Sequence, residues 1–397
     1  MVAELERRGV DLRWEDRLDA LDRRADHVSA WVRRVAGGRT RQLRARYLIG
    51  CDGARSAVRS RLRVAFGGST FVQRWLVVDA LVDRPLATAG HPHFVGDVER
   101  PIVCLPMSPG RHRWEWMLEP GENADEFLAP DRIEALLAPW IDDERVAVER
   151  AVVYTFHARM ASRWRAGRVL LAGDAAHVVP PFVGQGFSSG ARDAANLAWK
   201  LDAVLNGAPE RLLDSYEAER RPHAASMQSL AVSWGRVVQT TTPHIGWMRD
   251  ALIVGLERAR ALDWIQAHAK PLPTYATGAF AQRPHRLPFR RTVGALFPQP
   301  TVDGERLDDL LGPGWGAVST SSAAAEAFGA AGLGVLELPG DQWLGRHEVE
   351  WALLRPDRFV FACGSAGDAG AAISSLRRLV GNGLRSAPVR VSQAVAA

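Results

Sequence analysis

The segment from Gly167 to Leu201 holds residues whose types and order suit ligand chemistry: GRVLLAGDAAHVVPPFVGQGFSSGARDAANLAWKL. A short apolar run ends at Gly173-Asp174, and Gly184-Gln185-Gly186 opens a helix. A carboxylate at the C-terminal tip of a strand lies where open α/β sheets bind ligands, and it can accept a hydrogen bond from a polyol hydroxyl. Glycines let the backbone approach a ligand closely, and the free N–H groups of a helix start favour an anionic group.

The individual parts of this segment are weak signals, because a Gly-Asp pair or a GxG also fits an ordinary strand, turn and helix. The combination is more specific, since HxxPPFxGQG lies between the two parts and RDAANLAWKL follows them. The helix is predicted from about Phe187 onward, and its apolar residues recur at helical spacing. These apolar positions are Phe187, Ala191, Ala194, Leu197, Ala198, Leu201 and Leu205.

A second segment, YLIGCDGARSAVR at residues 47–59, has a related organisation. Its apolar run ends at Asp52-Gly53, which predicts a buried parallel strand that leads into a loop. The alternative is an ordinary Asp-Gly turn, with Arg55 and Arg59 as surface charges. The position of this segment ahead of the Gly173-Asp174 segment favours a shared functional role.

Together the two segments resemble the class A FAD-dependent aromatic hydroxylases, the flavoprotein monooxygenases that include p-hydroxybenzoate hydroxylase. The runs PPFVGQG and ARDAANLAWKL are most similar to the 3-(3-hydroxyphenyl)propionate hydroxylase group and its polyketide-hydroxylase relatives. The resemblance covers nearly the whole chain.

The resemblance implies FAD as the cofactor and gives a role to each matching residue. Asp174 would bind the ribitol chain, the GQG loop would lie along the pyrimidine ring, and Pro181 would lie near the reactive edge of the flavin. Asp52 and Gly53 would help to hold FAD and a passing nicotinamide cofactor, and Arg59 would brace their loop. The expected cofactor-binding residues are Asp52, Gly53, Arg59, Gly173, Asp174, Ala175, Pro181, Gly184, Gln185 and Gly186.

By the same resemblance, NAD(P)H would reduce FAD, and the reduced flavin would use O2 to hydroxylate a small aromatic substrate, usually a phenol. No catalytic residue is assigned. His157 and His177 are candidates for a base, although each is more typical of a hydrogen-bonded structural histidine. Trp114 and Trp116 share one face of a predicted strand and fit a pocket lining or a core equally well.

The elements that must position these residues indicate a mixed α/β and α+β chain. The expected fold is a partial Rossmann-like FAD-binding domain, similar to p-hydroxybenzoate hydroxylase, with an antiparallel-sheet substrate domain and a C-terminal thioredoxin-like domain. The C-terminal runs LDDLLGPGW and LRPDRFVFACG resemble the last of these. The predicted units are the remnant of the FAD-binding domain at 1–65, the substrate sheet at 66–158, the continued FAD-binding domain and helices at 159–270, a proline-rich linker at 271–300 and the thioredoxin-like domain at 301–397.

The composition argues against several classes of binding partner. The net charge is +5, but 48 of the 50 basic residues are arginines spread among acidic ones, so a nucleic-acid-binding patch is not expected. No apolar run is long enough to predict a membrane span. The three cysteines form no CxxC pair, so neither a metal site nor a redox-active C-terminal domain is expected, and a cytoplasmic location fits. A homodimer is compatible with the sequence.

The chain departs from the family pattern at one point, because no GxGxxG loop occurs in it. In the family this loop cradles the FAD pyrophosphate and belongs to a strand–helix–strand unit that precedes the matched region. A mis-set start, a fragment or a true loss would each explain this, and the sequence predicts weak or absent FAD binding by this chain alone. Three functions stay open: an active phenol hydroxylase, a non-catalytic remnant or interaction protein, and a flavin enzyme for a polyketide or a halogenated phenol.

Overall fold

The computed structural model describes residues 1–84, 86, 90–141, 145–261, 264–265, 273–285 and 291–381. Parts of four predicted units therefore lie outside the described residues: 85, 87–89 and 142–144 of the expected substrate sheet, 262–263 and 266–270 of the expected unit at 159–270, 271–272 and 286–290 of the expected linker, and 382–397 of the expected C-terminal domain. Within the described residues, no helix is both long enough and apolar enough to cross a bilayer.

The two segments that the sequence singles out meet in a small sheet. β4 (Leu48–Gly50) runs parallel to β11 (Val169–Leu171), and β10 (Arg165–Ala166) pairs antiparallel with the other side of β11. β11 is buried along its whole length, as its continuous apolar run predicts. Because parallel strands end at the same edge of a sheet, the loops that follow Gly50 and Leu171 emerge side by side.

A larger antiparallel sheet of six strands has the order β12-β9-β5-β8-β7-β6. Its edge strand β12 comes directly after the loop that follows β11, so this loop lies at the junction of the two sheets. The strands are β5 (Phe66–Val82), β6 (His93–Val95), β7 (Ile102–Pro106), β8 (Arg111–Met117), β9 (Val146–Ala161) and β12 (His177–Val178).

The two faces of the six-stranded sheet have different partners. One face packs against the short helices α3 (Ala124–Phe127) and α4 (Pro130–Leu137), and Trp114 and Trp116 lie fully buried in this core. The alternative that the two tryptophans form a core is therefore correct. The other face carries Trp75, Val103 and Met117, which pack against the PPFVGQG loop and the end of a long helix.

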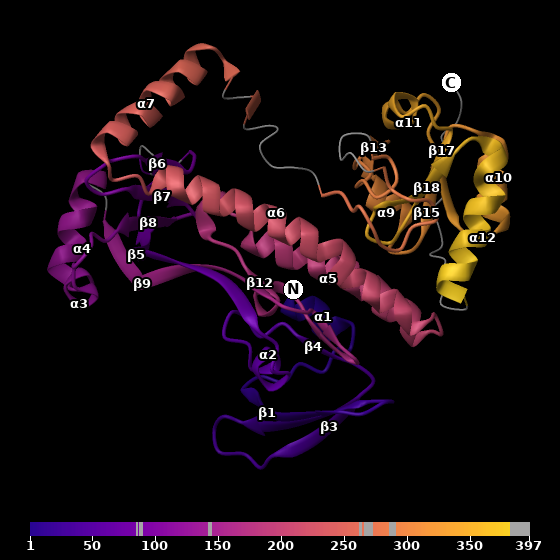
Figure 1. Ribbon diagram of the computed structural model, residues 1–397, viewed down its shortest axis with the longest axis horizontal. Coiled ribbons are helices and arrows are strands. Elements are labelled where there is room, and N and C mark those ends of the chain that lie inside the picture. The colour runs from indigo at the N-terminus through magenta and orange to yellow at the C-terminus, as the bar shows by residue number, and fades with distance from the viewer. Residues whose placement is uncertain are drawn as a thin grey trace.

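Two long helices, α5 (Gly186–Leu205) and α6 (Asp214–Val238), lie side by side and extend from the six-stranded sheet toward the C-terminal unit (Figure 1). A third helix, α7 (Pro243–Arg258), turns away from the end of α6. The N-terminal residues form a separate three-stranded antiparallel sheet of β1 (Asp16–Arg23), β2 (Val28–Arg34) and β3 (Arg41–Ala45). Two short helices, α1 (Val2–Arg7) and α2 (Ala57–Arg61), lie before and after these strands in the chain.

The C-terminal unit is a four-stranded mixed sheet with the order β16-β15-β17-β18. A parallel pair joined by α10 is followed by an antiparallel hairpin and α12, which is the arrangement of the thioredoxin fold. The described residues of 291–300 pack against it, because Val293 and Phe297 lie in its core. The unit begins with a short hairpin and helix: β13 (Thr301–Val302), β14 (Glu305–Arg306) and α9 (Leu307–Leu311). The sheet and its helices follow in the order β15 (Gly316–Ser319), α10 (Ser322–Ala330), β16 (Gly334–Glu337), α11 (Gln342–Arg346), β17 (Trp351–Leu354), β18 (Val360–Gly364) and α12 (Ala369–Val380).

Candidate functional site

The loop after β11 is a tight turn of 3-10 helix, η2 (Gly173–Ala175). Gly173 has φ +59°, a left-handed conformation that favours glycine, and an ideal Cβ on Gly190 of α5 would lie 3.4 Å from the Cα atom of Gly173. Asp174 is exposed beside this contact, and its neighbours shield it enough to raise the pKa of its carboxyl. Its carboxylate is therefore presented at the strand tip, where a hydroxyl group can reach it.

The loop after β4 is held by its own side chains. Asp52 accepts hydrogen bonds from Ser56 Oγ at 2.5 Å and from the Val58 amide at 3.0 Å, so it caps the start of α2. Gly53 has φ +77° and occupies the turn. The structure thus gives Asp52 a structural role, and its exposed position leaves a ligand-binding role as a proposal.

Arg59 joins the two loops. Its guanidinium donates from Nη1 to the Ala175 carbonyl at 2.9 Å and from Nη2 to the Ala54 carbonyl at 2.7 Å. The group also lies 3.7 Å from the ring centre of Phe66, and burial lowers its pKa. Because one buried side chain bonds to both loops, the loops that carry Asp52 and Asp174 form a single unit.

The PPFVGQG loop brings a helix start to the same region. A turn of 3-10 helix, η3 (Pro181–Val183), ends at Gly184, which has φ +62°, and α5 begins at Gly186 without a side-chain cap. Among the described residues, apart from the adjacent backbone, no atom lies within 4 Å of an ideal Cβ on Gly184 or Gly186. Gln185 is the N-cap residue of α5, and no side chain caps the helix start, so its first N–H groups are left without an intrahelical partner.

Aromatic rings fix this loop to the six-stranded sheet. Phe182 points inward, and its ring centre lies 6.1 Å from that of Trp75 and 5.5 Å from that of Phe156. Its neighbours Pro181 and Gly184 are exposed. The loop is thus anchored by one buried ring while its glycines and Pro181 remain accessible.

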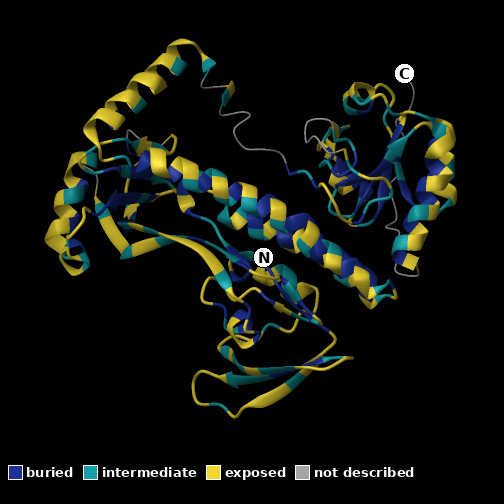
Figure 2. Ribbon diagram, in the orientation of Figure 1, coloured by how far each residue is buried: buried dark blue, intermediate teal, exposed yellow. Residues whose placement is uncertain are grey.

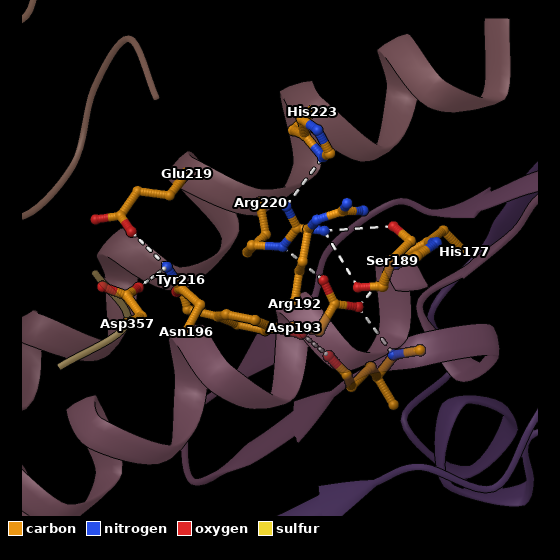
Figure 3. Close-up of polar contacts among 12 residues, drawn as sticks. His177, Ser189, Arg192, Asp193, Asn196, Tyr216, Glu219, Arg220, His223 and Asp357 are labelled. Carbon is orange, nitrogen blue, oxygen red and sulfur yellow. Dashed lines mark hydrogen bonds and ion pairs between the residues drawn. The ribbon is translucent and has the colours of Figure 1, made fainter. Parts of the chain in front are cut away.

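A buried ionic network around Asp193 holds the Gly173-Asp174 turn, and Figure 3 shows Asp193 with Arg220 and His177. Asp193 of α5 accepts hydrogen bonds from the Gly173 amide at 3.0 Å, from His177 Nε2 at 2.7 Å and from Arg220 Nε at 2.8 Å. Burial alone would raise the pKa of Asp193, but His177 and Arg220 outweigh it, and the pKa lies below its ordinary value. The turn is therefore held by a buried carboxylate that the sequence analysis did not identify.

The helix is present as predicted, but its apolar spacing does not describe its buried side. Of the seven apolar positions at helical spacing, Leu197 is buried and Leu201 packs against the core, whereas Phe187 is 84% exposed. The buried side combines the apolar residues Leu197, Trp199, Ala203 and Val204 with a polar stripe at helical spacing, formed by Ser189, Asp193, Asn196 and Lys200. This stripe can be buried because charged residues of α6 neutralise it, and the stripe itself is the sequence signal that could have revealed Asp193.

A second buried network joins α5, α6 and the C-terminal unit. Glu219 of α6 accepts hydrogen bonds from Lys200 Nζ at 2.8 Å and from both terminal nitrogens of Arg355, at 2.9 and 2.8 Å. Asn196 and Asp357 complete the cluster. All five side chains are almost fully buried, so each charge depends on its partners.

The sheet face beneath the PPFVGQG loop carries one poorly compensated carboxyl group. Glu115 is 7% exposed, and its neighbours across the strands are Val77 and Val103. The nearest cation, Arg113, forms two hydrogen bonds with Asp79, and its Nη1 atom stays 3.9 Å from Glu115. Burial therefore raises the pKa of Glu115 to about 7.

A cleft of about 680 Å³ opens beside this face. Its walls include Arg74, Met117 and Thr241, together with Val72 and Gln73 from an irregular stretch of β5. Bulges of this kind are frequent next to functional sites because they redirect side chains. The volume lies in the range that binds small ligands.

The two histidines that the sequence offers as bases differ in position. His177 is 1% exposed, stacks on Trp164 and bonds to Asp193, so it is structural. His157 is partly exposed on β9, and its Nδ1 lies 3.0 Å from Thr70 Oγ1. Neither histidine lines the cleft beside Met117.

Comparison with family models agrees with this geometry. Residues 1–231 match the family described as FAD binding domain, and residues 334–379 match the HcaD C-terminal domain. The 3-(3-hydroxy-phenyl)propionate/3-hydroxycinnamic acid hydroxylase of Mycolicibacterium gilvum (strain PYR-GCK) is 40% identical over 367 residues, which are 87% of this chain and 63% of that protein. The protein of the same name from Burkholderia cenocepacia (strain HI2424) is 34% identical over 401 residues, covering 89% and 72%. The chain thus spans less than two thirds of the first relative's length.

Solved structures show the same architecture. A ternary complex of aklavinone-11 hydroxylase with FAD and aklavinone has a TM-score of 0.73 at 27% identity, covering 96% of this chain and 76% of that one. Anhydrotetracycline hydroxylase OxyS from Streptomyces rimosus has a TM-score of 0.72 at 25% identity, covering 96% and 78%. These likenesses confirm the fold class that the sequence predicts.

Proposed function

The chain belongs to the FAD binding domain family, and we propose that it serves in the FAD-dependent hydroxylation of a small aromatic substrate, with NAD(P)H and O2 as co-substrates. One observation carries the proposal: the turn that carries Asp174 is bonded to α5, the helix with the uncapped start, through Asp193, and to the Asp52 loop through Arg59.

These residues fit the flavin end of FAD. Asp174 would accept a hydrogen bond from a ribitol hydroxyl, and the amides at Gly184, Gln185 and Gly186 would face the pyrimidine edge of the ring system. The partial positive charge of the helix start favours negative charge on that edge. When bound, FAD supplies the redox chemistry that activates O2, and the protein orients the ring and excludes water from it.

The substrate would bind in the cleft beside Met117, against the sheet face that also holds the PPFVGQG loop. Glu115 does not itself line the cleft, but it lies two residues before Met117 on the same face of β8, and we propose it as the acceptor for the proton of a phenol hydroxyl. A base acts best when its pKa lies near the working pH, and a carboxyl with a pKa of about 7 meets this condition. Arg113 forms its hydrogen bonds with Asp79 and stays 3.9 Å from Glu115, so the carboxyl of Glu115 keeps its raised pKa.

The functional test uses the purified chain with excess FAD, NADH or NADPH, and 3-(3-hydroxyphenyl)propionate as the aromatic probe. We expect oxidation of the nicotinamide together with a product that is one oxygen atom heavier, detected by mass spectrometry. Nicotinamide oxidation that yields only hydrogen peroxide would show that O2 is reduced without oxygen transfer to this substrate, and would contradict its hydroxylation. The absence of both, with FAD shown to be bound, would favour a non-catalytic interaction protein.

The variant Glu115→Gln tests the substrate side of the proposal. If Glu115 accepts the phenol proton, hydroxylation by the parent chain should rise with pH through about 7 as the carboxyl ionises, and the variant should lose this rise and about 10²-fold in rate. Flavin binding should stay unchanged. An unaltered pH profile in the variant would exclude Glu115 as the proton acceptor. The matched control is Glu134→Gln, an exposed change on α4, the helix that covers the opposite face of the sheet.

A further inference from the structure

Helix α7 leaves its apolar side chains exposed. It projects from the end of α6, and most of its surface is accessible (Figures 1 and 2). Gly246 is its only buried residue among those described, and Trp247 and Leu252 are 73% and 63% exposed. The exposed large apolar side chains of the helix are Ile245, Trp247, Met248, Leu252, Ile253 and Val254.

Few contacts hold α7 to the rest of the chain. Gly246 packs closely on Val98, and Arg249 donates a hydrogen bond to the Gly96 carbonyl. A helix of this length gains little stability by itself in water, because most helical stability in proteins comes from burying an apolar face. The exposed apolar side chains are distributed around the helix, and Trp247 and Val254 share the side that is turned away from Gly246. Exposed apolar surface of this kind marks an interaction site.

The side of α7 that is turned away from Gly246 and Arg249 is self-complementary. Trp247, Ala251, Val254 and Arg258 follow one another at helical spacing, and all four are exposed. An antiparallel copy of α7, related by a two-fold axis between residues 252 and 253, would place Trp247 opposite Arg258 and Ala251 opposite Val254. The small central residues would allow close approach of the helices, and the ends would form cation–π contacts.

Charge supports the same arrangement. Asp250 is exposed and pairs with Arg249 of its own helix. In the antiparallel arrangement, Arg258 of a second copy lies opposite Trp247 and so within one helical turn of Asp250, which would add a second ion pair. The two-fold axis repeats each of these pairs, as an isologous contact requires. The two arginines of α7 are balanced by Asp250 and Glu257, so the helix lacks the basic excess typical of helices that lie on anionic membranes.

We propose that α7 is the homodimer contact of this protein, with a second copy of the chain as its partner. The contact uses Trp247, Ala251, Val254 and Arg258, with Asp250 at its border. It does not depend on flavin binding.

Sedimentation velocity over a range of concentrations tests this proposal on the full chain. We expect a monomer–dimer equilibrium, which Val254→Asp should abolish and which Asp250→Arg or Arg258→Asp should each weaken on the order of tenfold. The double variant Asp250→Arg/Arg258→Asp restores opposite charges across the axis and should recover the affinity. Glu134→Arg, an exposed reversal on α4, is the control and should leave the equilibrium unchanged.

Three outcomes would overturn the proposal. The first is a monomer at every concentration, and the second is a dimer that Val254→Asp leaves intact. The third is a monomer that co-sediments with vesicles of anionic phospholipid, since this would assign α7 to a membrane surface. Circular dichroism of each variant shows whether it is folded, and recovery in the double variant separates a lost contact from a damaged helix.

Discussion

Replacing Glu219 with alanine is expected to lower the free energy of unfolding by about 3–5 kcal/mol. The substitution leaves Lys200 and Arg355 without their shared carboxylate, and both cations are fully buried. A buried cation without a partner costs far more than an exposed one, because neither water nor a counter-ion stabilises it. Urea denaturation followed by circular dichroism measures the change.

The control for this experiment is Glu326→Ala, which removes an exposed carboxylate from α10 and should change stability by less than about 0.5 kcal/mol. The double variant Glu219→Leu/Arg355→Leu should lose less than the sum of the two single variants, because it removes both members of the ion pair. Equal effects for Glu219→Ala and Glu326→Ala would contradict the described network.

The same carboxylate gives stability a defined pH dependence. Burial alone would raise the pKa of Glu219, but Arg355 and Lys200 lower it to about 2. An unfolded glutamate has a pKa of about 4.3, so the unfolded chain binds the proton first as the pH falls. The contribution of Glu219 to the free energy of unfolding is therefore fully present above about pH 4.3 and is lost as the pH falls toward 2. Glu219→Gln should remove this part of the dependence of unfolding free energy on pH.

Replacing Asp193 with alanine is the second change with a large expected effect, again about 3–5 kcal/mol. Arg220 would lose its counter-ion, and the Gly173 amide would lose its acceptor. The rate of hydrogen exchange should therefore rise at the amides of the Gly173–Ala175 turn in particular. A general loss of stability would instead raise exchange rates throughout the protein. Asp202→Ala, an exposed change on the same helix, should alter neither quantity. Unchanged exchange at the turn in Asp193→Ala would show that the turn does not depend on Asp193.

The sequence predicts the elements of the site better than their packing. The strand before Gly173 and the helix that begins at Gly186 follow from an apolar run and a glycine-rich start, and both are present. The buried side of α5 does not follow, because burial of Asp193 and Lys200 depends on Arg220, Glu219 and Arg355, and these partners are distant in the sequence.

The raised pKa of Glu115 is likewise a property that the sequence alone does not predict. Strand alternation assigns it to the face opposite Trp114 and Trp116, but its raised pKa depends on burial and on the commitment of Arg113 to Asp79. Local pattern does not contain this information, because the two partners lie on different strands. Family resemblance supplied the site residues, and burial and hydrogen bonding supplied the residues that support them.

The most direct test of the account is a titration of this chain with FAD, FMN and ADP, followed by protein fluorescence. The chain contains the residues proposed for the flavin end but no GxGxxG loop for the pyrophosphate. We therefore expect weak binding of FAD and FMN with similar affinity, no binding of ADP, and a loss of about 10- to 100-fold in Asp174→Ala, as removal of a charged hydrogen bond predicts. Binding of ADP as strong as that of FMN, or flavin binding that Asp174→Ala leaves unchanged, would contradict the assignment.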